Sequence, residues 1–164
     1  MLVRFVVLLL LLTTMAHAQA PDWRTASQEA YQLHKAGRTE EALKLAERAV
    51  ELAGEADDPL AVATTTNTWG LICLELEDFY NADKRFELAA SLYESDPRLG
   101  PEHEFTAKVY KNRGLCLQEL GRYRESETYL RKALHNYELL DPEHHHPLTL
   151  DILKGLANTL LEEA

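Results

Sequence analysis

Residues 68–93, TWGLICLELEDFYNADKRFELAASLY, decide the fold, because most of their pattern returns in residues 112–137 as NRGLCLQELGRYRESETYLRKALHNY. In both stretches a glycine is followed by a small residue, a larger apolar residue and an alanine at the same spacing. The two series are Gly70, Ala82, Phe86, Ala89 and Gly114, Ser126, Leu130, Ala133. Self-similarity over this distance predicts a protein built from stacked repeats.

The first small residue of each unit marks the start of the series. These markers are Ala30, Gly70, Gly114 and Ala157, and the steps between them are 40, 44 and 43 residues. Two antiparallel helices approach to roughly 8 Å only where one of them presents a small residue at the crossing. Each unit is therefore expected to be a helical hairpin, with Phe86 or Leu130 filling the space beside the glycine.

The residues that carry a family resemblance are Trp69-Gly70, Ala82, Phe86 and Ala89, and then Gly114, Tyr123 and Ala133. They resemble the signature of the tetratricopeptide repeat. The period exceeds the usual length of about 34 residues and is similar to the variety of about 42 residues in kinesin light chains and many bacterial exported proteins. The match is weaker in the first repeat, where Glu29 stands at the position of Trp69. The resemblance implies an all-α right-handed solenoid of antiparallel helical hairpins.

Caps and loop prolines place the expected helices. Thr39, followed by two glutamates, is expected to cap one helix, and Asp58-Pro59 to begin the next. The helices expected are 22–36, 40–53, 59–76, 79–95, 102–120, 123–140 and 147–163, with no strand. Residues 19–164 are then one repeat domain, with repeats at about 23–56, 63–96 and 107–140 and a lone final helix.

Residues 1–18 have the features of a signal peptide. Arg4 provides a positive charge, residues 5–12 are apolar but too short to span a bilayer, and Ala16-His17-Ala18 matches a cleavage signal. We expect cleavage after Ala18 and a periplasmic or secreted mature protein. The alternative is an uncleaved membrane anchor.

The chain is acidic, with a formal net charge of −10 that becomes one unit more negative when Arg4 is removed. An acidic chain repels nucleic-acid phosphates and anionic membrane surfaces, so neither is an expected partner after signal cleavage. Cys73 and Cys116 are too few for a disulfide-stapled scaffold. Buried thiols are favoured, although a bridge between neighbouring helices stays open at this point.

In the resembled family, the first helix of each repeat lines a concave groove that binds protein segments. Carried over by position, the groove residues are Arg24, Tyr31, His34, Asn67, Leu71, Leu74, Lys108, Lys111, Asn112, Leu115, Lys154 and Asn158. Their composition suits an extended or helical peptide with apolar anchors and acidic flanks. The alternative is that the leucines belong partly to the core and the lysines are merely solvated.

The last helix carries a second candidate surface. Ile152 and Leu156 are expected to pack onto the third repeat, whereas Leu153, Ala157 and Leu160 face the place where a further helix would lie. An apolar flank at the end of a repeat array favours association. Three explanations stay open: a longer native protein, which analogy favours slightly, a homodimer through this face, or a partner that covers it.

Motifs for catalysis or cofactors are absent from the sequence. His103-Glu104 begins like a zinc-protease helix, but Ala107 stands where the second histidine is needed. His144-His145-His146 could offer two imidazoles to one ion, yet the repeat loop already accounts for His146. No enzyme activity, cofactor or metal is expected. The chain is interpreted as an exported adaptor or scaffold that binds protein, or alternatively as a self-associating module or the input domain of a longer protein.

Overall fold

The computed structural model describes residues 22–141 and 147–162 and consists there of seven helices without a strand. The helices are α2 (Trp23–Lys35), α3 (Thr39–Glu55), α4 (Pro59–Glu75), α5 (Phe79–Ser95), α6 (Glu104–Glu119), α7 (Tyr123–Leu140) and α8 (Pro147–Glu162). All seven lie within two residues of the expected bounds. The signal peptide prediction and the three adjacent histidines fall outside the described residues.

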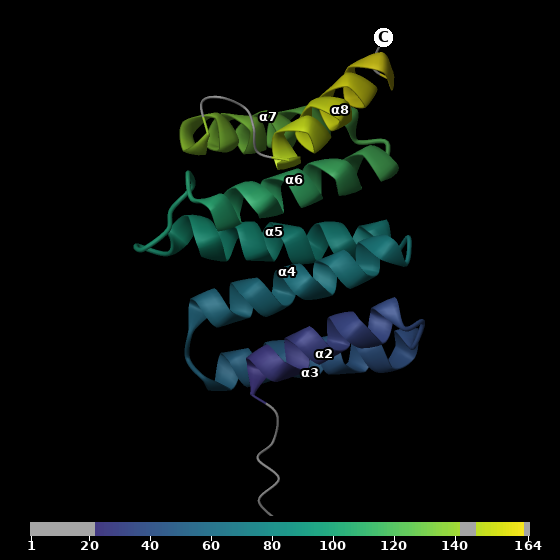
Figure 1. The fold of residues 1–164 in the computed structure, drawn as a ribbon, viewed down its shortest axis with the longest axis vertical. Helices are drawn as coiled ribbons and strands as arrows, with labels where there is room; N and C mark the ends of the chain where they lie inside the picture. The colour runs from purple at the N-terminus through teal and green to yellow at the C-terminus, as the bar shows by residue number, and fades with distance from the viewer. Residues whose placement is uncertain (1–21, 142–146, 163–164) are drawn as a thin grey trace, which may run out of the picture.

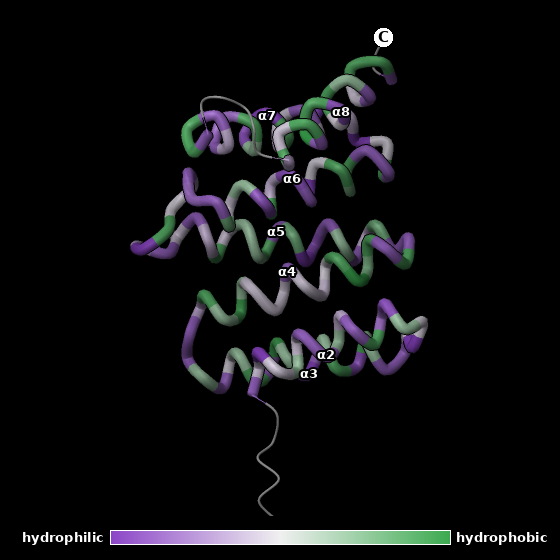
Figure 2. The backbone as a smooth tube through the Cα atoms, in the orientation of Figure 1, coloured by the Kyte–Doolittle hydropathy of each residue, from purple (hydrophilic) through white to green (hydrophobic). Residues whose placement is uncertain are grey.

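Successive helices stack into an elongated array of antiparallel hairpins, α2–α3, α4–α5 and α6–α7, with α8 packed on the end (Figure 1). The predicted all-α solenoid is therefore confirmed. Apolar residues recur along every helix instead of gathering in one block, which Figure 2 shows along the backbone. Each hairpin thus contributes a share of a core that continues from one repeat to the next.

The described helix starts follow two designs. Asp22, Asp58, Asp78 and the His103 ring accept a backbone N–H at the starts of α2, α4, α5 and α6. Arg38 and Arg122 precede α3 and α7 instead, and each pairs with a glutamate three residues later. The expected cap at Thr39 is wrong, because Thr39 is already inside α3 and Arg38 occupies the cap without a side-chain hydrogen bond.

The close approach of the two helices in a hairpin depends on the marker glycines. A Cβ atom at Gly70 would lie 2.7 Å from Phe86 Cε1, and one at Gly114 would lie 2.6 Å from Leu130 Cγ. Phe86 and Leu130 are fully buried. The predicted pairing of a glycine with a larger apolar residue is therefore the contact that sets the helix spacing in the second and third repeats.

Candidate functional site: the inner helix face

The helices form two layers with different packing. The inner layer is α2, α4, α6 and α8, and each of these helices contacts the next one of the layer. The outer layer is α3, α5 and α7, whose members make no contact with one another within the described residues. Because the inner helices lie closer together than the outer ones, the stack curves toward the inner layer. All twelve predicted groove residues lie on inner helices.

Lys111 is the distinctive charged residue of the inner face. Its side chain is half-buried, and burial lowers the pKa of its ammonium group, a shift that the nearby Asp151 opposes. Within the described part of the chain Lys111 makes no hydrogen bond or ion pair. A half-buried ammonium without a close partner is a ready binding point for an anionic group.

The other cations of this face are more exposed. Lys108 pairs with Glu104 at 2.5 Å and lies 5.6 Å from the Phe105 ring centre. Arg24 stacks on the neighbouring Trp23 ring, and Lys154 is exposed on α8. These side chains remain free to reorient toward a ligand, because surface ion pairs contribute little energy.

The leucines of the inner face belong to both the core and the surface. Leu71, Leu74 and Leu115 are partly buried and pack against the main apolar cluster. Leu115 also lies beneath α8, where a Cβ atom on Gly155 would approach its Cδ2 to 3.0 Å. The leucines therefore add apolar surface to the inner face, but only part of each leucine can contact a ligand.

Several polar residues of the predicted groove are used to join the inner helices. His34 Nε2 lies 2.6 Å from Glu75 Oε2, and Lys35 donates to the same carboxylate, so α2 is joined to α4. Asn112 is buried and donates to Asn67 Oδ1 at 3.3 Å. His34 and Asn112 thus hold neighbouring repeats together, and Asn67 shares that role at the edge of the face.

Gln118 makes the corresponding link between α6 and α8. Its Nε2 donates to Gly155 O and Thr159 Oγ1, both at 2.8 Å. Tyr31 is half-buried and Asn158 is exposed. Asn158, Gln118 and Leu161 share the lining of a hollow of about 310 Å³ at this end of the face.

One aromatic residue of the site was missed by position-based reasoning. Phe105 is 42% exposed on the first turn of α6 and lies beside Tyr93, His103 and Lys108. Exposed aromatic rings next to a cation are common anchors in protein interfaces. The available signal was its place one helical turn before Lys108, which puts both on one face.

A buried ion cluster holds the outer layer beside the site. Arg113 pairs with Asp83 and Glu87 and donates to the Tyr129 hydroxyl, and Arg122 pairs with the same Asp83. Arg113 and Asp83 are both at least nine-tenths buried. The cluster connects α5, α6 and α7 through side chains that satisfy one another, so its role is structural.

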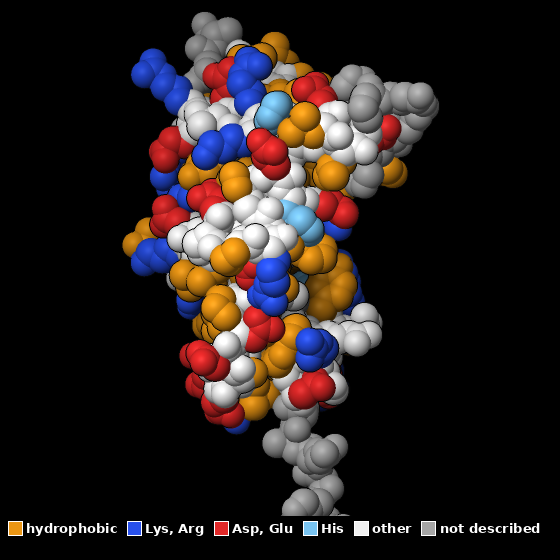
Figure 3. All heavy atoms as spheres, turned by 90° about the vertical axis from the view of Figure 1, so that its left-hand side faces the viewer, with side chains coloured by type: hydrophobic (Ala, Val, Ile, Leu, Met, Phe, Trp, Pro, Cys, Tyr) orange, Lys and Arg blue, Asp and Glu red, His pale blue; other side chains and the backbone are white. Residues whose placement is uncertain are grey.

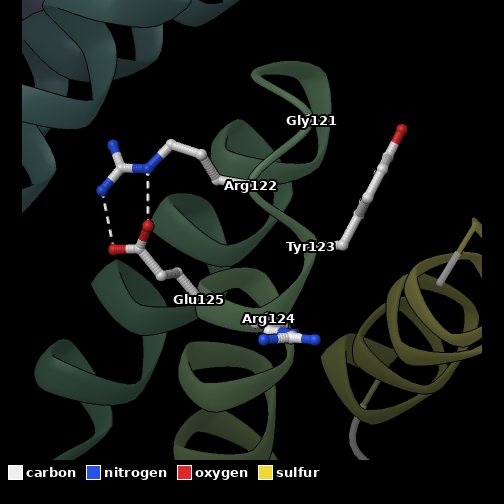
Figure 4. Close-up of a pocket in the computed structure, with 5 residues that line it drawn as sticks. All are labelled: Gly121, Arg122, Tyr123, Arg124 and Glu125. Carbon is white, nitrogen blue, oxygen red and sulfur yellow. Dashed lines mark hydrogen bonds and ion pairs between the residues drawn. The ribbon is translucent and has the colours of Figure 1, made fainter.

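The edge of the solenoid drawn in Figure 3 carries interspersed acidic and basic side chains with apolar ones between them. Neither sign of charge forms a continuous patch there. The hollow at the α6–α7 turn does not resemble a catalytic centre either. In Figure 4 Arg122 donates two hydrogen bonds to the Glu125 carboxylate, while Tyr123 points away from that pair.

Cys73 and Cys116 are free and buried thiols, which favours the interpretation without a bridge. Burial raises the pKa of Cys73 to about 11 and that of Cys116 to about 12, and Cys116 Sγ lies 3.1 Å from Phe79 O. Within residues 22–141 and 147–162 no group of three or more metal-binding side chains comes together. None of the helices described has the length and apolar character to cross a membrane.

Comparisons with known proteins agree with this architecture. Residues 61–139 match the family model of the tetratricopeptide repeat. None of the curated protein sequences matches the chain. Among solved structures, BtubC (BKLC) from P. vanneervenii is similar with a TM-score of 0.77 and 20% identity over 90% of this chain and 60% of that one.

A second group of similar structures is described as a putative kinesin light chain with nearly identical TPR-like repeats from Podosopora anserina. A variant form has a TM-score of 0.75 and 15% identity, and another form has 0.73 and 16%, each over 85% of this chain and 66% of that one. The chain therefore spans about two thirds or less of the length of these structures. At such identities the likeness shows a shared fold.

Proposed function

We propose that this tetratricopeptide-repeat chain is an exported interaction module that binds a segment of another protein along its inner helix face. Tetratricopeptide repeats generally mediate protein–protein interactions and are typically non-catalytic. The specific proposal is an adaptor whose ligand is a peptide segment with apolar anchors and an acidic flank.

The observation that carries the proposal is the environment of Lys111. Keeping a lysine half-buried without a close partner costs stability, since burial disfavours its charged form. That cost is explained when a ligand carboxylate completes the pair. Asp151 lowers the local positive potential, so the ligand group must come closer to Lys111 than Asp151 does.

The neighbouring residues supply the other contacts. Leu71 and Leu115 follow Asn67 and Asn112 by one helical turn, and their exposed parts add apolar surface on one side of the Asn67–Asn112 bond. Phe105 and Lys108 form a second anchor at the start of α6. An extended or helical segment could contact both anchors at once, which is the usual arrangement for peptide recognition in a groove.

Peptide selection followed by matched variants tests the inner face. Peptides are selected from a random library against the whole chain, and their affinities are compared for the wild type, Lys111→Met and Lys84→Met. Lys84 is an exposed lysine of the outer layer that lies over the Tyr80 ring. We expect Lys111→Met to weaken binding by roughly tenfold or more and Lys84→Met to have no effect. Equal effects, or selected peptides without acidic residues, would refute the proposal.

Export rests on residues 1–18 and has its own test. The intact mass of the protein isolated from its native host is measured, together with its N-terminal residue. We expect the chain to begin at Gln19 and to be found outside the cytoplasm. A chain that begins at Met1 in the cytoplasmic fraction would refute export without affecting the binding proposal.

A further inference from the structure

Among the described helices, α8 exposes the most large apolar side chains, and three of them lie on the face that points away from the third repeat. Thr149, Ile152, Leu156 and Thr159 are buried against the third repeat. Leu150, Leu153 and Leu160 are 57%, 47% and 46% exposed, and Ala157 between them is also exposed. Gly155 fixes this orientation, because it lets α8 approach Leu115 and Leu130 closely.

The equivalent face is covered in the other repeats. The steps of 43 and 44 residues relate Ala157 to Gly114 and Gly70, which are covered by Leu130 of α7 and Phe86 of α5. The residues equivalent to Leu150, Leu153 and Leu160 are Ala107, Tyr110 and Leu117 in α6 and Ala63, Thr66 and Cys73 in α4, and all six are buried. The exposed face of α8 is thus the side that a helix covers in the preceding repeats.

The spacing of the exposed residues matches helix pairing. Leu150, Leu153, Ala157 and Leu160 are separated by three, four and three residues, which is the alternation of core positions in a paired helix. The pattern is also self-complementary. When two copies of α8 run antiparallel about Gly155, Leu153 lies opposite Ala157 of the other copy and Leu150 lies opposite Leu160.

At its centre, where Leu153 meets Ala157, this register reproduces the contact already present inside the second and third hairpins. A large side chain meets a small one, as Phe86 meets Gly70 and Leu130 meets Gly114. The opposite end of the solenoid offers no equivalent surface, because α2 and α3 expose no large apolar side chain. A second copy can therefore cover this face with its own α8 but not with α2 or α3.

We infer that the α8 face, defined as Leu150, Leu153, Ala157 and Leu160, binds the same face of a second copy in an antiparallel, two-fold symmetric dimer. Such an interface is closed, since each copy uses its apolar end once. None of these four residues is among the twelve groove residues, although Lys154 and Asn158 lie beside them on α8. The dimer can therefore fail its test without affecting the peptide-binding proposal. Its consequence is that two grooves would be presented together, which raises the avidity for a partner with two binding segments.

Sedimentation of the purified whole chain over a range of concentrations tests the dimer. Leu153→Asp is compared with Leu88→Asp, which alters a leucine of similar exposure on the outer layer. We expect a wild-type dimer, a dissociation constant raised by roughly 30-fold or more in Leu153→Asp, and no change in Leu88→Asp. A wild type that stays monomeric, a dimer that tolerates Leu153→Asp, or open-ended oligomers would overturn the inference.

Cysteine pairing tests the register separately. Differently tagged Leu153→Cys and Ala157→Cys proteins are mixed under mild oxidation, and each is also oxidised alone. We expect the mixed dimer to form a disulfide faster than either protein alone, because residue 153 of one copy faces residue 157 of the other copy and not its own equivalent. Faster cross-linking of either protein alone would contradict the antiparallel register. Melting temperatures of all variants establish that they are folded.

Discussion

Gly114 lies where α6 crosses α7, and the hydrogen it carries in place of a methyl group sets how closely the two helices approach. The neighbouring Leu130 is fully buried, and a Cβ atom at Gly114 would lie 2.6 Å from its Cγ and 3.3 Å from its backbone N. Gly54 is a useful contrast, since it also lies within a helix but has no neighbour within 4 Å of an added Cβ. Glycine therefore allows close helix packing at position 114, whereas at position 54 it only weakens the helix.

Alanine substitution is expected to have opposite effects at these two glycines. Gly114→Ala should lower the free energy of unfolding by about 1–2 kcal/mol, because overpacking outweighs the gain in helix propensity. Gly54→Ala should raise it by about 0.5–1 kcal/mol, because only the propensity gain applies. Urea unfolding monitored by circular dichroism measures both. A stabilising Gly114→Ala would contradict the tight crossing.

The charge of Lys111 is expected to lower the stability of the fold while it strengthens peptide binding. Burial lowers the pKa of its ammonium group in the folded chain, so the unfolded chain binds the proton more tightly. Its charge therefore opposes folding at neutral pH, and this penalty decreases as the pH rises from the lowered pKa toward the ordinary value of 10.5.

Replacing Lys111 should separate its effect on stability from its effect on peptide binding. Lys111→Met is expected to leave the unfolding midpoint unchanged or higher while it weakens peptide binding. Thermal melting at neutral pH and binding by calorimetry measure the two effects on one sample. A large loss of stability would show that Lys111 supports the fold rather than a ligand.

At the scale of helices and turns, the turns of the three hairpins share one backbone conformation but place different residues in it. The turn inside each hairpin contains a residue with positive φ, which is Gly37 (75°), Glu77 (60°) or Gly121 (70°). Glycine adopts this conformation without a Cβ penalty, whereas glutamate does not. The second hairpin therefore has a strained turn that the other two lack.

Exchanging the turn residues tests this difference. Glu77→Gly should stabilise the chain by about 1 kcal/mol, because it removes the steric cost of a left-handed conformation. The matched change Gly121→Glu should destabilise it by a similar amount. Unfolding midpoints in urea provide the measurement, and effects of the same sign at both turns would contradict this account.

The buried cluster of Arg113, Asp83 and Arg122 is expected to act as one unit across α5, α6 and α7. Asp83→Leu alone leaves Arg113 buried without its main partner and should cost about 3–5 kcal/mol. The double change with Arg113→Met should recover much of that loss, because no unpaired buried charge remains. A double-mutant cycle by chemical unfolding measures the coupling, and additive losses would argue against a single cluster.

The sequence was sufficient to predict the helices, because their boundaries depend on local caps, turn glycines and prolines. Asp58-Pro59 began α4 as expected, while Thr39 failed as a cap because Arg38 already occupies that position. The contacts between repeats could not be predicted. His34 meets Glu75 and Asn112 meets Asn67 across more than 40 residues, and these contacts depend on how far each repeat rotates against the last.

The same geometry explains what could be predicted of the site. Position within the repeat was enough to place Lys108, Lys111 and Leu115 on the inner helices. It could not show which side chains stay available, since Asn112 is buried while Lys111 has no close partner within the described residues. Phe105 was missed because it lies before the positions that line the groove in the resembled family.

At the scale of the whole molecule, the two layers give the chain two different kinds of surface. The inner layer exposes lysines, parts of several leucines and a phenylalanine, whereas the ion cluster that joins α6 to α5 and α7 is satisfied internally. The end of the stack adds a third surface on α8. The proposed peptide binding and the inferred dimer are compatible, because they use different residues.

The most direct test of the central claim is to locate a bound peptide on the surface. A library-selected peptide that carries a photoreactive group is irradiated in complex with the whole chain, and the cross-linked residues are identified by mass spectrometry. The account predicts cross-links on the inner helices α4, α6 and α8, near Leu71, Lys111 and Asn158. Cross-links confined to the outer helices α3, α5 and α7 would contradict it.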